Sequence, residues 1–185
     1  MKYNNQIFLD EFKNKMLEIN PQKVLFVCSK DYDRYGYRKA LDEISIKSVS
    51  FTSFEPCPEV SSVENGIEAY KANECDFVVA VGGGSAIDTA KGIKFYSKLD
   101  FDILAVPTTA GTGAEVTRFS VLYRNKDKES VSDYWTLILS GQLHPFAESN
   151  LTSDNGILYH YERLDAHFLL TIQLRYLALY LLVLH

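Results

Sequence analysis

The chain of 185 residues lacks the features that mark several classes of protein. Its 24 Asp and Glu outnumber its 19 Lys and Arg, so it has no basic excess that would bind nucleic acid. Its three cysteines, Cys28, Cys57 and Cys75, have neither metal-binding nor redox spacing, and the N-terminus shows no apolar leader. We therefore expect a cytoplasmic protein in a reducing compartment, without a nucleic-acid partner.

Long apolar runs are missing as well. The uninterrupted run Tyr176–Leu184 has nine residues, whereas a membrane-spanning helix needs about 20. Arg175 prevents its extension. We expect no membrane partner, and a short C-terminal membrane segment is the alternative for this part of the chain.

The composition changes near residue 130. Residues 1–130 contain 17 of the 19 Lys and Arg and 7 leucines, whereas residues 131–185 contain 14 leucines, no Lys and all four His. A folded domain rarely changes its residue usage so abruptly. We predict a native domain over residues 1–133 and an atypical leucine-rich tail over residues 134–185, explained by a frameshift or a premature end.

Within residues 1–133, apolar runs typical of buried strands alternate with segments of helical periodicity. Continuously apolar strands joined by helices are typical of a parallel sheet covered on both faces. The sequence therefore predicts an α/β, Rossmann-like fold. The expected helices cover 6–18, 34–43, 59–73 and 85–96, and the expected strands 24–27, 46–54, 77–81 and 103–106, followed by a hairpin of 116–123 and 130–133 around a turn at 124–127.

Three successive glycines, Gly82–Gly84, directly follow the apolar run Phe77–Val81. Glycine lets a backbone approach a phosphate closely and adopt positive φ. We expect Ser85 to cap the next helix, whose free N–H groups favour an anion, and Asp88 to complement the same helix end. The loop is not GxGxxG, because Ile87 takes the third glycine position, and it is not a Walker loop. A plain tight turn is the alternative, but such a turn does not need three glycines.

A second loop, Pro107–Thr117, follows the apolar run Ile103–Val106. Its threonine hydroxyls can donate and accept hydrogen bonds, which suits ribose and amide groups. The alternative is a turn in which these hydroxyls satisfy only the backbone. Because the two loops follow neighbouring strands, together they predict a rim that binds phosphate and sugar.

The two loops resemble those of the iron-containing (group III) alcohol dehydrogenase family. The matching segments are GGGSAIDTAK at Gly82–Lys91 and PTTAGTGAEVT at Pro107–Thr117, and Phe54–Pro58 stands where the family has a Pro-x-Pro loop. The resemblance covers about residues 5–133. Dehydroquinate synthase, which shares the fold and a Gly-Gly-Gly loop, is a more distant likeness.

The resemblance implies an N-terminal domain that binds NAD(H) or NADP(H), and a helical domain that holds a divalent metal, iron or zinc. It also implies small alcohol or aldehyde substrates and, often, a homo-oligomer. The residues that it implies around the cofactor are Gly82, Gly83, Gly84, Ser85, Asp88, Thr108, Thr109, Thr112 and Thr117, with Lys128 as a ribose contact.

Ser29 marks a departure from the family pattern. Members specific for NAD resemble Val-Thr-Asp-Lys after the first strand, where the Asp binds ribose hydroxyls, and here the segment is Val27–Lys30. A carboxylate would repel a 2′-phosphate, whereas Ser29 and Lys30 would tolerate one, so the sequence favours NADPH. A solvated Lys30 without a role is the alternative. Cys57, where many members resemble Asn, is expected to be an ordinary loop residue.

A metal site that matches the family pattern is missing from the sequence. The family needs an Asp and three His, with Asp-x-x-x-His on one helix face. The nearest segment is Asp165–His167, whose spacing points the two side chains about 200° apart on a helix, and His144 and His160 have no matching context.

We therefore expect a metal-dependent alcohol dehydrogenase or aldehyde reductase lineage, of which this chain carries only the cofactor-binding half, inactive by itself. No catalytic residue is assigned. A non-catalytic nucleotide-binding module and a dehydroquinate synthase-like lyase fragment are the alternatives.

Overall fold

The structure, a computed structural model, describes residues 5–30, 36–109, 113–132 and 137–139. Helices and strands alternate along them. The elements are α1 (Asn5–Ile19), β1 (Lys23–Cys28), α2 (Tyr37–Glu43), β2 (Lys47–Phe51), α3 (Val60–Ala72), β3 (Phe77–Gly82), α4 (Gly84–Ser97), β4 (Ile103–Pro107), the 3-10 helix η2 (Ala114–Val116), β5 (Phe119–Arg124), β6 (Asp127–Ser132) and β7 (Leu137–Leu139).

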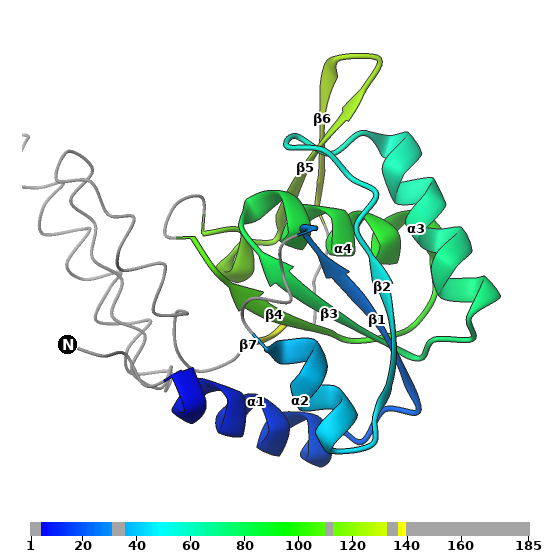
Figure 1. Cartoon of the computed structure of the whole chain (residues 1–185). Helices are drawn as coiled ribbons and strands as arrows, with labels where there is room; N and C mark the ends of the chain where they lie inside the picture. The colour runs from blue at the N-terminus through cyan, green and yellow to red at the C-terminus, as the bar shows by residue number, and fades with distance from the viewer. Residues whose placement is uncertain (1–4, 31–35, 110–112, 133–136, 140–185) are drawn as a thin grey trace, which may run out of the picture.

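Five strands form one parallel sheet in the order β2-β1-β3-β4-β7, with helices on both faces (Figure 1). Parallel strands need such cover because they are apolar on both sides, and β3 and β4 are buried along their whole length. The chain runs from β1 to β2 on one side and returns to β3 on the other side of β1. The predicted α/β, Rossmann-like fold is confirmed.

The two faces of the sheet carry separate apolar cores. On the α3/α4 face, Ile93 of α4 and Leu122 of β5 are fully buried. On the α1/α2 face, Phe12 and Met16 of α1 are fully buried, and the Phe12 ring packs edge-on against Tyr37 of α2 with centroids 5.0 Å apart. Each such side chain stabilises the fold by about 1.5–3 kcal/mol through burial.

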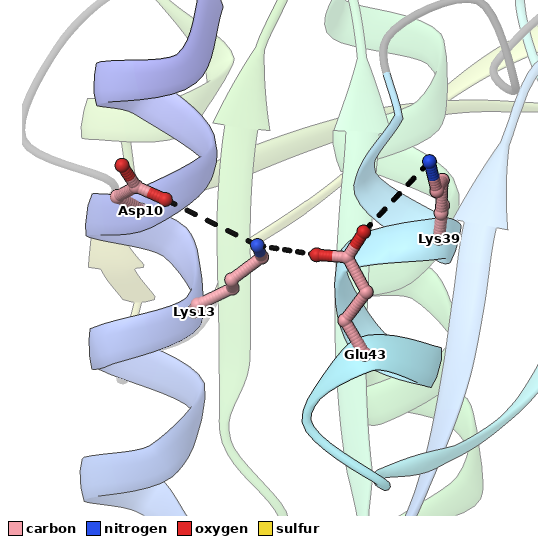
Figure 2. A network of polar contacts seen from close by, with 4 residues as sticks. All are labelled: Asp10, Lys13, Lys39 and Glu43. Carbon is pink, nitrogen blue, oxygen red and sulfur yellow. Dashed lines mark ion pairs between the residues drawn. The ribbon is translucent and has the colours of Figure 1, made fainter.

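Charged side chains also join α1 to α2, at the surface. Lys13 pairs with Asp10 of its own helix and with Glu43 of α2, which also pairs with Lys39 (Figure 2). The hydrogen bond between Lys13 and Glu43 raises the pKa of the lysine and lowers the pKa of the carboxyl. Water screens such exposed pairs, so the two helices are held together mainly by their apolar side chains.

Most predicted elements are confirmed with shifted ends, and the end of β2 needs a correction. The strand ends at Phe51, not Phe54, because Phe51 is the last residue that pairs with β1, opposite Val27. The next residues leave the sheet, and Thr52 and Phe54 line a cavity.

The predicted hairpin is confirmed, but its ends are wrong. Residue 116 belongs to η2, so β5 begins only at Phe119. The turn contains only Asn125 and Lys126, both at positive φ (52° and 72°), as a type I′ turn requires. Because this turn is so tight, β6 begins at Asp127 rather than Ser130.

Strand β7 pairs with β4 at one end of the sheet order, with Ile103 opposite Leu137. It follows residue 133, where we drew the boundary of the domain from composition, and that division stays a prediction. The remaining tail, residues 140–185, lies outside the described residues. Among the residues that the structure describes, no helix is long and apolar enough to cross a membrane.

Candidate functional site

A cavity of about 620 Å³ lies at the carboxyl edge of the parallel sheet. Its lining comes from the ends of four strands: Ser29 and Lys30 after β1, Thr52 after β2, Gly82 of β3 and Thr108 after β4. The strand order reverses in the middle of this edge, between β1 and β3. Open α/β sheets bind ligands at such a reversal, so the fold itself favours this cavity as a binding site.

A second cavity, of about 440 Å³, adjoins the first, because Gly84 and Ser85 at the start of α4 line both. The hairpin, η2 with the residues after it, and the loop before α3 form its other walls. The hairpin and the loop before α3 are joined by a hydrogen bond from the Tyr123 N–H to the Pro58 carbonyl, 2.9 Å. The two cavities therefore form one groove, with the start of α4 at its middle. The remaining lining residues of the second cavity are Cys57, Asp88, Ala114, Thr117, Phe119 and Val121.

The glycine loop, Gly82–Gly84, needs glycine for conformation and for space. Gly82 has a φ of 155°, which strains any other residue, and a Cβ there would lie 2.8 Å from the Cβ of Ala86. A Cβ on Gly83 would lie 2.6 Å from Thr109 Oγ1. Glycine therefore allows the backbone between β3 and α4 to lie directly against the threonine loop.

Ser85 is not the N-cap residue that we predicted. The helix begins at Gly84 with Gly83 in the N-cap position and no side-chain cap, because the third glycine already belongs to the helix. Ser85 lies in the first turn, and its Oγ accepts a hydrogen bond from the Cys57 N–H, 3.4 Å. The N–H groups of Ala86 and Ile87 both donate to the Gly83 carbonyl, so the donors that the start of α4 offers at the groove are the N–H groups of Gly84 and Ser85, which have no partner within the helix.

The predicted threonines lie in both cavities. Thr108 and Thr109 line the first, and the Thr108 N–H donates to the Gly82 carbonyl at 2.9 Å, which joins the two loops. Thr117 lines the second, and its Oγ1 donates to the Phe119 carbonyl at 3.3 Å, so this hydroxyl also satisfies the backbone. Thr112 lies outside the described residues.

The other predicted site residues are divided between the groove and the surface. Ser29 lines the first cavity beside Lys30, and Glu55 lines it too. Lys128 is exposed on β6 opposite Tyr123 and is not among the residues that line either cavity. Cys57 lies at the second cavity with a φ of 63°, a conformation in which Asn is several-fold enriched.

Asp88 does not complement the start of α4 as we predicted. It lies beyond the first turn, and its carboxylate accepts a hydrogen bond from the Val121 N–H, while the Asp88 carbonyl accepts one from Ser120 Oγ at 2.9 Å. Burial raises the pKa of the Asp88 carboxyl to about 6. This side chain therefore connects α4 to β5 beside the second cavity.

Sequence reasoning missed Lys91 as a residue of this region. Its side chain is fully buried, and burial lowers its pKa to about 8. Its Nζ donates to the carbonyls of Ala114, Thr117 (2.8 Å) and Phe119 (3.0 Å). The available signal was a lysine within a helix of small and apolar residues, which marks a buried rather than a solvated amine.

The described part of the chain contains no group of three or more His, Cys, Asp or Glu side chains that could hold a metal ion. The segment Asp165–His167, together with His144 and His160, lies outside the described residues. The described residues by themselves therefore do not fit a metal ion.

The sequence profile of the iron-containing alcohol dehydrogenases matches residues 5–137. The chain belongs to this family. It is 40% identical to the choline dehydrogenase of Bacillus subtilis, with 64% of this chain and 36% of the relative covered, and 34% identical to the NADPH-dependent butanol dehydrogenase of Clostridium saccharobutylicum, with 66% and 32% covered. The chain thus spans about a third of the length of these curated relatives.

Solved structures agree with the sequence match. The sulfoacetaldehyde reductase of Bifidobacterium kashiwanohense, solved in complex with NAD⁺, superimposes with a TM-score of 0.62 at 30% identity, covering 71% of this chain and 41% of that chain. The predicted family is therefore confirmed by sequence and by fold.

Proposed function

We propose that this chain binds NAD(H) or NADP(H) in the groove, as the cofactor-binding part of a metal-dependent alcohol dehydrogenase or aldehyde reductase. The observation that carries the proposal is that two cavities meet at the N-terminal end of α4. A dinucleotide has two halves joined by a pyrophosphate, and a helix N-terminus after a glycine loop favours such an anion. The pyrophosphate would lie at Gly83–Ser85, with one half of the cofactor in each cavity.

Shape and lining support this assignment. The volumes of about 620 and 440 Å³ fall within the range of ligand pockets, about 300–1,000 Å³. Gly83 has no room for a side chain beside Thr109, so bare backbone faces the proposed pyrophosphate position. Thr108 and Thr109 would contact the half in the first cavity, and Asp88 and Thr117 would contact the half in the second.

The lining of the first cavity favours NADPH over NADH. Ser29 and Lys30 follow β1, where an acidic residue would otherwise bind the ribose hydroxyls and repel a 2′-phosphate. Glu55 lines the same cavity and opposes this effect, so we expect a preference rather than strict selection. The variant Ser29→Asp should shift the preference towards NADH.

The reaction class follows from the relatives. Their names include choline dehydrogenase, NADPH-dependent butanol dehydrogenase and sulfoacetaldehyde reductase, so we propose a small alcohol or aldehyde as substrate. The bound nicotinamide would supply the hydride chemistry, and the residues of this chain would bind and orient it. Because the described residues contain no group of three or more potential metal ligands, we expect that these residues alone support no turnover.

A titration of the full chain with NADPH and NADH tests the proposal, followed by energy transfer from its tyrosines and Trp135 to the nicotinamide. We expect saturable binding of both, tighter for NADPH. Gly83→Val should abolish nucleotide binding without changing the circular dichroism spectrum. Lys47→Ala, at the start of β2 and so at the amino edge of the sheet, should leave nucleotide binding unchanged. A folded chain that binds neither nucleotide would overturn the proposal, and turnover with added Fe²⁺ or Zn²⁺ would overturn the expected inactivity.

A further inference from the structure

Residues 114–119 form one wall of the second cavity, yet they are not part of the parallel sheet. We infer that Lys91 is a positioning residue whose ammonium holds this wall against α4 and thereby sets the shape of the second cavity. The inference rests on the proposed function for its effect on the cofactor. The hydrogen bonds by which Lys91 holds the wall need no cofactor and can be tested without one.

The contacts of Lys91 match the chemistry of an ammonium group. A protonated lysine has three N–H donors and no acceptor. The Lys91 Nζ donates to three carbonyls, those of Ala114, Thr117 and Phe119, which are spread along the whole wall. One side chain therefore fixes the 3-10 helix, its C-terminal end and the first residue of β5.

The surroundings of Lys91 explain why its charge matters. The side chain has no exposed surface, and the charged groups that act on it are Asp88 of α4 and Glu115 of η2. Both carboxylates favour the protonated lysine, but burial has the larger effect and lowers its pKa to about 8. A neutral amine has two N–H donors and a lone pair, so the wall loses one hydrogen bond as the pH rises through about 8.

Stability and cofactor affinity should then respond to pH with opposite signs. The pKa of Lys91 is lower in the folded chain, about 8, than its ordinary value of 10.5. Folding is therefore penalised by this group below about pH 8 and gains stability as the pH rises between the two values. NADPH affinity should instead decrease through about pH 8, because the wall is held less firmly.

Lys91→Met, Lys91→Gln and Lys94→Met, made in the full chain, test the inference. Lys94 is the matched control: it lies one turn further along α4 and donates to the Phe101 carbonyl, at the edge of the sheet away from the groove. Hydrogen exchange of the amides of residues 113–121 reports the wall directly. NADPH titration across pH reports its effect on the cofactor.

We expect Lys91→Met to increase exchange over residues 113–121 and to weaken NADPH binding about tenfold, with no pH step near 8. Cys57 also lines the second cavity, but its thiol is present in both the wild type and Lys91→Met. It therefore cannot account for a difference in pH dependence between these two chains. Lys91→Gln keeps two N–H donors without the charge, so its exchange and its NADPH affinity should lie between those of the wild type and of Lys91→Met. If Lys91→Met fails to fold, Lys91→Gln still tests the inference. Lys94→Met should change neither readout.

Unchanged exchange over residues 113–121 in both Lys91 variants would overturn the inference. Increased exchange with unchanged NADPH affinity and pH profile would overturn its link to the cofactor. Failure of the wild-type chain to bind any nicotinamide nucleotide would instead count against the proposed function, and the exchange measurement would still decide whether Lys91 holds the wall.

Discussion

The two faces of the sheet bury different kinds of side chain. On the α1/α2 face the core is apolar, and charged residues such as Lys13 and Glu43 lie at its surface. Among the described residues, the buried polar or charged side chains belong to α4, to β5 and to the loop that leads from the end of β4 through η2: they are Thr89, Lys91, Thr108, Glu115 and Ser120. The fold therefore buries polar groups around the groove and relies on apolar packing on the other face of the sheet.

The helices of the α3/α4 face also lie unusually close together. A Cβ on Gly92 of α4 would be 2.9 Å from Val63 of α3, and a Cβ on Gly66 of α3 would be 2.5 Å from Ile93 of α4. Close packing of this kind leaves little freedom to the helix that presents the glycine loop. We therefore expect substitutions on the α3/α4 face to change the affinity for the nucleotide. Substitutions on the α1/α2 face should change mainly the stability of the fold.

The largest expected effect is on stability and comes from the α1/α2 face. Phe12→Ala removes a fully buried ring and should lower the free energy of unfolding by about 3–5 kcal/mol, measured by urea denaturation. Leu17→Ala, on the same helix but 54% exposed, should change it little. The nucleotide affinity of the folded Phe12→Ala chain should be unchanged, and a parallel loss of affinity would contradict the independence of the two faces.

Gly82, before α4, and Gly36, before α2, both have a positive φ, 155° and 78°. The variants Gly82→Ala and Gly36→Ala therefore compare the same kind of substitution next to one helix of each face. Each should lose roughly 1–2 kcal/mol of stability through left-handed backbone strain, and Gly82→Ala somewhat more because of the contact with Ala86. Only Gly82→Ala should weaken NADPH binding, by about tenfold or more. Equal affinities in isothermal titration would show that the glycine loop does not contact the cofactor.

Asp88→Asn should change how stability depends on pH. Burial raises the pKa of Asp88 from 3.8 to about 6, so the folded chain binds this proton more tightly than the unfolded chain. Its contribution to stability is present below about pH 4 and is lost as the pH rises to about 6. The difference in unfolding free energy between wild type and Asp88→Asn should therefore decline across this window, and a constant difference would contradict the assigned burial.

The smallest effect is expected from Glu43→Gln, at the surface of the α1/α2 face. The hydrogen bond to Lys13 lowers the pKa of Glu43, so its stabilisation is present above the ordinary value of 4.5 and is lost as the pH falls through the lowered one. Because the pair is exposed, the change in thermal midpoint should be slight and should disappear at high salt. A change that persists at high salt would mean that packing, not charge, had been altered.

The sequence predicted the elements whose residues follow a repeating pattern. Apolar runs at Phe77–Val81 and Ile103–Val106 specify buried strands, and the motifs after them specify where the loops lie along the sheet edge. What it did not predict depends on contacts between distant residues. The N-cap residue is Gly83 rather than Ser85, because Gly84 already belongs to the helix. The hydrogen-bond partners of Lys91 lie more than 20 residues further along the chain.

Strand β1 pairs on one side with β2 and on the other with β3, so Val24 lies between Ser48 and Phe77. During synthesis the chain makes β1 first, and its second partner appears only some fifty residues later. Until then one edge of β1 presents backbone N–H and C=O groups that have no partner strand, and pairings this distant in sequence form slowly. We expect nascent chains that end before Phe77 to require a chaperone, and those that extend beyond Pro107 to become protected from protease.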